Sequence, residues 1–255
     1  MRSIVLGSGS KGNSSLIMDN KTNILIDVGF SYPKTKMLLE QYNIKPEDID
    51  AILITHTHKD HIGGLKSFIK KYHTPVYANF ELKKELGKII DEEGIILVGD
   101  KFNINHLNIE TIFTSHDAVG SVGFIIDNNR TSLVYVTDTG FLNQENLSKL
   151  INKNIYIFES NHDIEMLWNG PYPYILKQRI VSDYGHLSNE MCSNYLDMLI
   201  GDKTKKIVLA HLSETNNCPE KAYNQTNNFL GDKLLGKELL IASQDSSIDL
   251  GDIDD

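Results

Sequence analysis

The sequence predicts an α/β fold in which two β-sheets lie face to face and helices cover them on the outside. Short apolar segments of strand length alternate with segments of helical spacing along the whole chain of 255 residues. The chain contains no Pro/Ser-rich linker, low-complexity tract or repeat of fixed period. We therefore expect a single domain over residues 1–255, with the two sheets packed as a layered structure.

The first half of the chain is expected to be rich in strands. Helical spacing of apolar residues predicts one helix that ends near Asn43 and another over residues 62–72. Strands are expected at residues 3–6, 16–18, 23–29, Ala51–Ile54, Pro75–Tyr77, Gly94–Val98, Lys101–Ile104, Leu107–Phe113, Ser121–Ile126 and Leu133–Val136.

The second half becomes more helical. Helices are expected at Asn143–Ile151, in the segments 165–168, 172–180 and 188–200, and at Pro219–Leu230. Strands are expected at Ile155–Phe158, 205–210, Leu239–Ala242 and Ser247–Leu250. The acidic residues 245–255 are expected to form a frayed tail.

The composition is that of a globular protein of the cytoplasm. Hydrophobic residues make up 40% of the chain and charged residues 23%, so a full core can form. Two cysteines are too few for a disulfide framework or a thiolate zinc site. We see neither an N-terminal signal pattern nor an apolar segment long enough to span a membrane. The net charge of −9 does not favour binding of nucleic acid through bulk electrostatics.

The segment THTHKDH at 55–61 carries four side chains that can bind metal ions: His56, His58, Asp60 and His61. It lies between a predicted buried strand and a predicted helix, where a short loop can aim alternate side chains in different directions. Imidazole and carboxylate groups are expensive to bury without partners, and a metal ion supplies such partners. The segment therefore predicts a metal site.

Further candidate ligands follow other predicted strands. His116, Asp138 and His211 each stand after an apolar strand, where the sites of α/β sheets are usually assembled. The order HxHxDH, then His116, Asp138 and His211, resembles the metallo-β-lactamase fold over essentially the whole chain. The resemblance implies an αββα four-layer sandwich with a binuclear metal site.

The resemblance also implies roles for these residues. His56, His58 and His116 would hold one metal ion, Asp60, His61 and His211 the other, and Asp138 would bridge them. Asp27 and His162 would orient the ligands, although Asp27 before Gly29 also suits a simple turn. We expect two divalent ions, zinc as isolated, with manganese as an alternative activator.

Such a site predicts hydrolysis. Two ions about 3.5–4 Å apart can hold a bridging hydroxide at neutral pH, and Asp60 would take part in this catalysis as a ligand. Glu159 and His186 match a Glu/His pair of transfer-RNA 3′-processing relatives, where the pair is thought to pass a proton to the leaving oxygen. The alternative is that His186 only caps the following helix.

The sequence most resembles the YycJ/WalJ-like subgroup of this fold, through LGSGSKGNSS, FTSHDAVGSVGF, the segment 159–189 and LAHLSETNN. This resemblance implies a 5′→3′ exonuclease that acts on DNA. A phosphodiesterase for small cyclic nucleotide-type esters is the alternative enzyme, and a metal-binding regulatory scaffold is the alternative outside enzymes. The oligomeric state is left open.

Two segments are candidates for substrate contacts. Ser8, Ser10 and Asn13 in the glycine-rich turn could hold a phosphate, or the turn could be a plain flexible hairpin. Tyr172 and Tyr174 could stack on a base, or could pack in the core.

Overall fold

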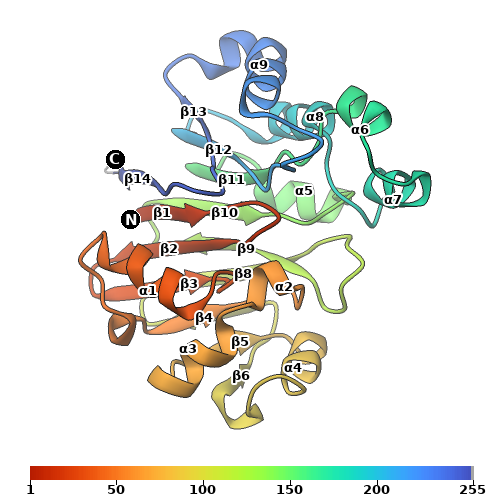
Figure 1. Cartoon of the computed structure of the whole chain (residues 1–255). Helices are drawn as coiled ribbons and strands as arrows, with labels where there is room; N and C mark the ends of the chain where they lie inside the picture. The colour runs from red at the N-terminus through yellow and green to blue at the C-terminus, as the bar shows by residue number, and fades with distance from the viewer. Residues whose placement is uncertain (254–255) are drawn as a thin grey trace. The chain divides into compact units, whose positions relative to one another are not determined.

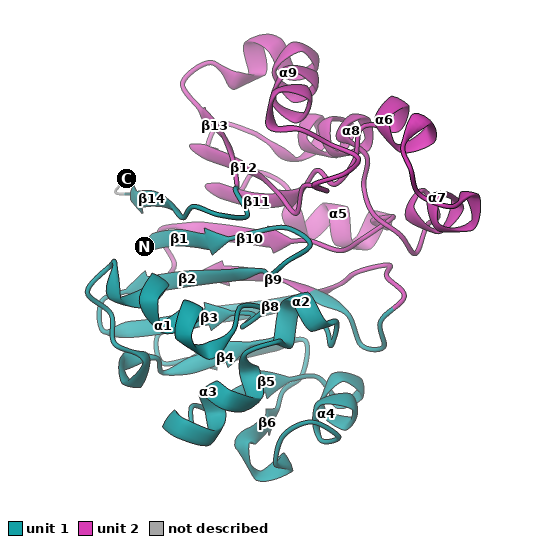
Figure 2. Ribbon diagram, in the orientation of Figure 1, with its two compact units in different colours: residues 1–111, 118–122, 243–255 teal, residues 112–117, 123–242 magenta. Residues whose placement is uncertain are grey.

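The computed structural model of the chain describes residues 1–253, and the chain divides into two compact units. Unit 1 contains residues 1–111, 118–122 and 243–255, and unit 2 contains residues 112–117 and 123–242 (Figure 2). Each unit contains strands of a mixed β-sheet with helices packed against them, so the predicted α/β class is confirmed. The expectation of a single domain stays a prediction.

The sheet of unit 1 has seven strands in the order β14-β1-β2-β3-β4-β5-β6 (Figure 1). From β14 to β3 neighbouring strands are antiparallel, and from β3 to β6 they are parallel. The strands are β1 (Arg2–Gly7), β2 (Ser14–Asp19), β3 (Thr22–Ile26), β4 (Ala51–Leu53), β5 (Val76–Ala78), β6 (Ile95–Leu97) and β14 (Ile248–Asp252). An antiparallel pair, β7 (Lys101–Ile104) and β8 (Leu107–Phe113), follows β6 along the chain.

Three helices of unit 1 bury apolar side chains against this sheet: α1 (Tyr32–Glu40), α3 (Leu65–Tyr72) and α4 (Phe80–Leu86). Their buried residues, such as Leu39 and Phe68, share a core with alternate residues of the strands, such as Leu25 and Ile52. The short helix α2 (Lys59–Ile62) directly follows the loop after β4. The sheet and its helices thus fix the position of the histidine-rich segment.

Unit 2 holds the strands β13-β12-β11-β10-β9, of which β10 to β13 run parallel. Their bounds are β9 (Val122–Asp127), β10 (Ser132–Val136), β11 (Ile155–Glu159), β12 (Lys206–Ala210) and β13 (Glu238–Ile241). The helices are α5 (Gln144–Leu150), α6 (Ile164–Asn169), α7 (Tyr174–Ile180), α8 (Asn189–Leu199) and α9 (Pro219–Leu230). Apolar residues of α5, α8 and α9 share a core with the strands.

Side-chain caps explain where several helices begin. Asn79, Asn143, Asp163 and Ser188 each precede a helix and accept a hydrogen bond from a backbone N–H of its first turn. A cap of this kind satisfies a donor that the helix itself leaves unpaired. These short polar residues therefore set the ends of the loops that lead away from the strands.

Most predicted elements are confirmed, with three corrections. Helix α4 was not predicted, because its core contacts are only Leu82 and Leu86 among charged residues. The first predicted helix ends at Glu40, a turn earlier than Asn43. The expected tail at 245–255 contains β14, since Leu250 is buried and the strand pairs with β1; residues 254–255 of that tail lie outside the described part. Within residues 1–253, no helix is long and apolar enough to cross a membrane.

Candidate metal centre

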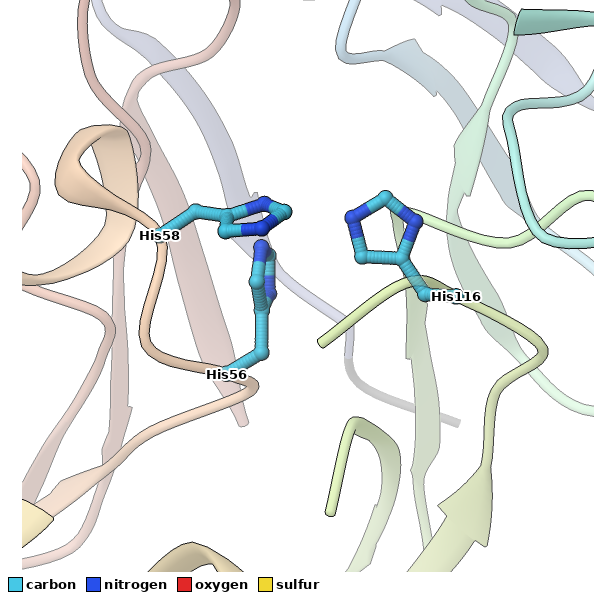
Figure 3. A group of neighbouring side chains, drawn as sticks. All are labelled: His56, His58 and His116. Atoms are coloured by element: carbon cyan, nitrogen blue, oxygen red, sulfur yellow. The ribbon is translucent and has the colours of Figure 1, made fainter. Parts of the chain in front are cut away.

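The loop after β4 gathers three histidine rings and a carboxylate within unit 1. His56 is fully buried, His58 stands immediately before α2, and His61 lies within α2. The ring centroid of His56 lies 4.6 Å from that of His58 and 4.1 Å from that of His61. Figure 3 shows His56 and His58 on this loop with their rings edge to face. The segment thus concentrates donor atoms as its sequence predicted.

Asp27 fixes the orientation of one of these rings. Its Oδ2 lies 2.7 Å from Nδ1 of His61, and it also accepts hydrogen bonds from the Thr55 backbone N–H (2.8 Å) and hydroxyl (2.9 Å). Burial raises the pKa of Asp27, and the neighbouring His61 opposes that rise. A carboxylate can only accept, so Nδ1 of His61 carries the hydrogen and Nε2 is the nitrogen with the lone pair. That tautomer is the one suited to metal binding.

Asn13 ties the glycine-rich turn to the same loop. Its amide Nδ2 lies 3.0 Å from Nε2 of His61 and 3.3 Å from Oδ2 of Asp60. Its Oδ1 accepts hydrogen bonds from the Gly9 N–H and from the Ser8 hydroxyl. Asn13 and Ser8 are both buried. The side chains of these two residues therefore hold the turn and the loop together, whereas Ser10 of the same turn is exposed.

In unit 2, His116 follows β8 and is nearly buried (Figure 3). Its Nδ1 lies 3.2 Å from the carbonyl oxygen of Gly185, so this nitrogen donates and Nε2 is the acceptor. Nε2 lies 3.4 Å from Oδ1 of Asp117 and 3.8 Å from Oδ1 of Asp138. Burial lowers the pKa of His116, although the carboxylate of Asp138 opposes this. Burial therefore favours the neutral form of this candidate ligand.

Glu159, at the end of β11, orients two further rings. Its Oε1 lies 2.8 Å from Nδ1 of His186 and 2.9 Å from Nδ1 of His211. Its Oε2 accepts hydrogen bonds from the backbone N–H groups of Thr139 and Leu187. Burial raises the pKa of Glu159, but His186 and His211 outweigh burial and lower this pKa to about 2. The carboxylate therefore stays ionised and keeps Nε2 of both rings available.

Three of the candidate residues adopt a left-handed backbone that is unusual for their type. Asp27, Asp138 and His211 have φ angles of 61°, 56° and 58°. Each stands at the carboxyl end of a strand, after β3, β10 and β12. This conformation costs on the order of 1–2 kcal/mol for a residue other than glycine. Strain of this kind occurs at functional sites, where the turn is needed to aim a side chain.

The donors present in each unit fit a divalent metal ion. In unit 2, ligand atoms of Asp138, Glu159, His186 and His211 all lie within 4.8 Å of one another. In unit 1, the donors are imidazole nitrogens and one carboxylate, a set that zinc, manganese and iron accept. In both units an acceptor on Nδ1 leaves Nε2 for coordination. Each unit thus offers nitrogen and oxygen donors that suit a divalent ion.

The structure also describes the surroundings of the other predicted site residues, His162, Tyr172 and Tyr174. His162 is buried, and burial lowers its pKa to about 4; within residues 1–253 its Nδ1 has no hydrogen-bond partner. Tyr174 is 65% exposed, and its ring centroid lies 6.1 Å from that of Trp168, which is 41% exposed. Tyr172 is half-buried. Core packing of Tyr174 was the alternative to base stacking, and it is wrong because the side chain is exposed.

Two threonines of the site were not predicted. Thr55 donates to Asp27, and the Thr139 hydroxyl accepts from the Ser115 N–H while its own N–H donates to Glu159. Both follow an apolar strand and stand next to a predicted ligand, in THTH and TDTG. That position is the signal by which they could have been found.

Comparison with known proteins places these features in a family. The model of the metallo-beta-lactamase superfamily matches residues 7–211. The exodeoxyribonuclease WalJ of Streptococcus pneumoniae is 40% identical over 252 residues, which cover 96% of this chain and 94% of that protein. The exodeoxyribonuclease YycJ of Bacillus anthracis is 38% identical over 237 residues, covering 91% and 90%.

A solved structure shows the same fold. The metallo-beta-lactamase fold protein YhfI from Bacillus subtilis superposes with a TM-score of 0.73 at 15% sequence identity, over 97% of this chain and 99% of that chain. At this identity the likeness concerns the fold alone. It agrees with the α/β sandwich that the sequence predicts.

Proposed function

The chain belongs to the metallo-beta-lactamase superfamily, and from this premise we propose that it is a metal-dependent 5′→3′ exonuclease acting on DNA. The observation that carries this proposal is a 38–40% identity to two exodeoxyribonucleases over at least nine-tenths of the chain. Both clusters of donor residues are present in that span. A regulatory scaffold without turnover would not need them.

By likeness to the superfamily, His56, His58 and His116 would hold one divalent ion, Asp60, His61 and His211 would hold a second, and Asp138 would contribute to both. The orientation of the His61, His116 and His211 rings by acceptors on Nδ1 supports this assignment. We propose zinc as the bound metal, with manganese as an alternative that supports activity, because imidazole and carboxylate ligands suit both.

Two ions in such a site supply an activated water and neutralise charge on the attacked phosphate. The protein's own residues would then handle the leaving group. Glu159 holds Nδ1 of His186, and the ring is partly exposed with 20% of its side chain accessible. His186 can therefore present Nε2 to the leaving oxygen and donate a proton to it. Glu159 is fully buried and acts on this step only through the ring.

A small-diester phosphodiesterase is the second candidate. The net charge of −9 favours it, because a compact substrate needs no extended track of basic residues. The two cysteines are free, which supports a location in the reducing cytoplasm for either activity.

One digestion experiment separates these candidates. Metal-loaded protein is incubated with single- and double-stranded DNA and RNA, labelled at the 5′ or 3′ end, and with a small phosphodiester. We expect release of labelled mononucleotide from the 5′ end of DNA and no activity in His58→Ala. Digestion of the small diester alone would overturn the nuclease proposal, and activity that survives in His58→Ala would reveal a contaminant.

Tyr174, which is exposed, and Tyr172, which is half-buried, are proposed to contact bases. Replacing Tyr172 and Tyr174 together by Ala should raise the KM for DNA about tenfold, since stacking contributes roughly 1–3 kcal/mol per base. Metal content, measured by mass spectrometry, should stay unchanged. An unchanged KM would exclude the stacking role.

A further inference from the structure

Unit 1 contains a cavity that the proposed metal ligands do not account for. It measures about 440 Å³, within the range of roughly 300–1,000 Å³ in which small-molecule sites fall. Its lining belongs to three segments that lie far apart in the sequence. The residues that define it are Ser10, Lys11, Gly29, Ser31, Lys59, Asp60 and Gly63.

Close backbone contacts join the segments that line this cavity. The N–H of Asn13 donates to the carbonyl oxygen of Asp60 (2.7 Å), and the N–H of Gly29 donates to the carbonyl oxygen of Asn13 (3.0 Å). A Cβ at Gly29 would lie 1.8 Å from the Asp60 oxygen, and one at Gly63 would lie 2.7 Å from the Gly29 oxygen. Only glycine permits this approach of the three segments. These contacts therefore fix the backbone around the cavity, and the exposed side chains that line it are called its rim.

The rim is rich in groups that bind anions. Lys11 and Lys59 are both exposed at the cavity, and Ser10 and Ser31 add two exposed hydroxyl groups. Among residues 1–253, no carboxylate pairs with Lys59. In contrast, the nearby Lys34 ammonium lies 4.0 Å above the ring of Phe30. Two ammonium groups in one cavity are notable in a chain of net charge −9.

We propose that this cavity binds a phosphate of the DNA substrate other than the one that is cut. The inference rests on the proposed function. Asp60 lines the cavity and is also a proposed metal ligand, so a phosphate held by Lys11 and Lys59 lies beside the reaction centre. The volume is large enough for a phosphate group. The two lysines supply positive charge locally, whereas the net charge of the chain does not favour an extended track of basic residues.

The bound phosphate can come from two sources, the 5′-terminal phosphate or an internal linkage of the strand. Both offer anionic oxygens to the same ammonium and hydroxyl donors. A 5′-phosphorylated and a 5′-hydroxyl oligonucleotide of the same sequence distinguish them. A larger loss of binding with the phosphorylated strand assigns the terminal phosphate, and an equal loss assigns an internal one.

The test uses the variants Lys11→Gln, Lys59→Gln and the double variant, with Lys66→Gln as control. Lys66 is exposed on α3 and does not line the cavity. Binding of fluorescent single-stranded DNA with hydrolysis-resistant phosphorothioate linkages is measured by anisotropy at several salt concentrations. We expect the double variant to bind roughly tenfold more weakly, because charge-assisted hydrogen bonds are lost. The salt dependence of log K should fall by about 0.7 for each lysine removed.

Hydrolysis by the same proteins separates this inference from the proposed function. If wild-type protein binds DNA more tightly than the double variant but does not cut it, the proposed nuclease activity is refuted and the proposed phosphate cavity stays supported. Variants that bind DNA like wild type would overturn the cavity, whatever the nuclease activity. The small diester carries no second phosphate, so kcat/KM in the double variant should fall more for DNA than for the small diester. An equal loss on both substrates would overturn the phosphate cavity, because the lysines would then support the site as a whole.

Discussion

Two buried carboxylates, Asp27 in unit 1 and Glu159 in unit 2, both orient candidate ligand rings, but they face different numbers of rings. Each follows or ends a strand, is fully buried, and accepts a hydrogen bond from Nδ1 of a candidate ligand. Asp27 serves one ring, His61, whereas Glu159 serves two, His186 and His211. The number of histidine rings that each carboxylate faces accounts for the difference between their pKa values.

The pKa values of the two carboxylates move in opposite directions. Burial raises the pKa of both groups, and it prevails at Asp27, where His61 is the main opposing group. At Glu159 the two histidines prevail and the pKa falls to about 2. A buried carboxylate is stabilised in its charged form only when enough donors and positive charge face it. We infer that Glu159 supports both ligand orientation and proton transfer, and that Asp27 supports ligand orientation alone.

The largest effect is therefore expected for Glu159→Gln. The amide keeps the size of the side chain but removes the charge that orients both rings. We expect kcat/KM on DNA to fall roughly 10³-fold, since a general acid contributes about 10²–10⁴-fold and loss of a ligand's hydrogen-bond partner weakens metal binding. Glu220→Gln, an exposed residue of α9, is the matched control. A loss of less than threefold would mean that the rings hold their positions without this carboxylate.

Asp27→Asn is expected to lower metal affinity and to leave the pH dependence of kcat unchanged. The amide cannot accept from His61 and Thr55 as the carboxylate does, so the ligand ring loses its fixed tautomer. We expect metal affinity to fall about 10- to 100-fold, measured by competition with a chromogenic chelator. Asp202→Asn, exposed to solvent, serves as control. If Asp27→Asn altered the basic limb of the pH profile of kcat as strongly as Glu159→Gln, the proposed division of roles would be wrong.

A smaller effect is expected from His162, which is buried in unit 2 three residues after Glu159. Its pKa in the folded chain is about 4, below the usual value of 6.5, because burial disfavours the charged ring. A lowered pKa gives stability that is present above pH 6.5 and is lost as the pH falls toward 4. That loss is on the order of 3 kcal/mol for this one group.

Urea unfolding of the metal-free protein between pH 7 and pH 4 measures this contribution. His162→Asn should lose less stability over that range than wild type. His73→Asn, an exposed position with a left-handed backbone in unit 1, should follow the wild-type curve. Parallel curves for wild type and His162→Asn would show that the ring is not buried in a neutral form.

The two clusters also differ in how far the sequence alone could predict them. The donors of unit 1 come from one loop, so THTHKDH indicates a metal site by its spacing. The donors of unit 2 come from the ends of β8, β10, β11 and β12, and only the family pattern relates them in advance. The hydrogen bonds that Glu159 accepts from two rings depend on the parallel order of β10 to β12, which no local pattern reveals.

The fold was more predictable than the details of the turn at residues 7–13. Alternating apolar strands and helices define the α/β class because burial imposes those periods. The inward direction of Asn13 could not be predicted, since it depends on hydrogen bonds to a loop nearly fifty residues away. The cavity at Lys59 could not be predicted either, because it forms where glycines allow backbone segments to approach each other closely.

The central claim is that the two clusters together bind two metal ions, and a metal count tests it most directly. Protein purified by gel filtration is analysed by inductively coupled plasma mass spectrometry, for wild type, His58→Ala and His211→Ala. We expect two ions per chain in wild type and the loss of at least one ion in each variant. One ion per chain in wild type, or two retained in His211→Ala, would contradict it.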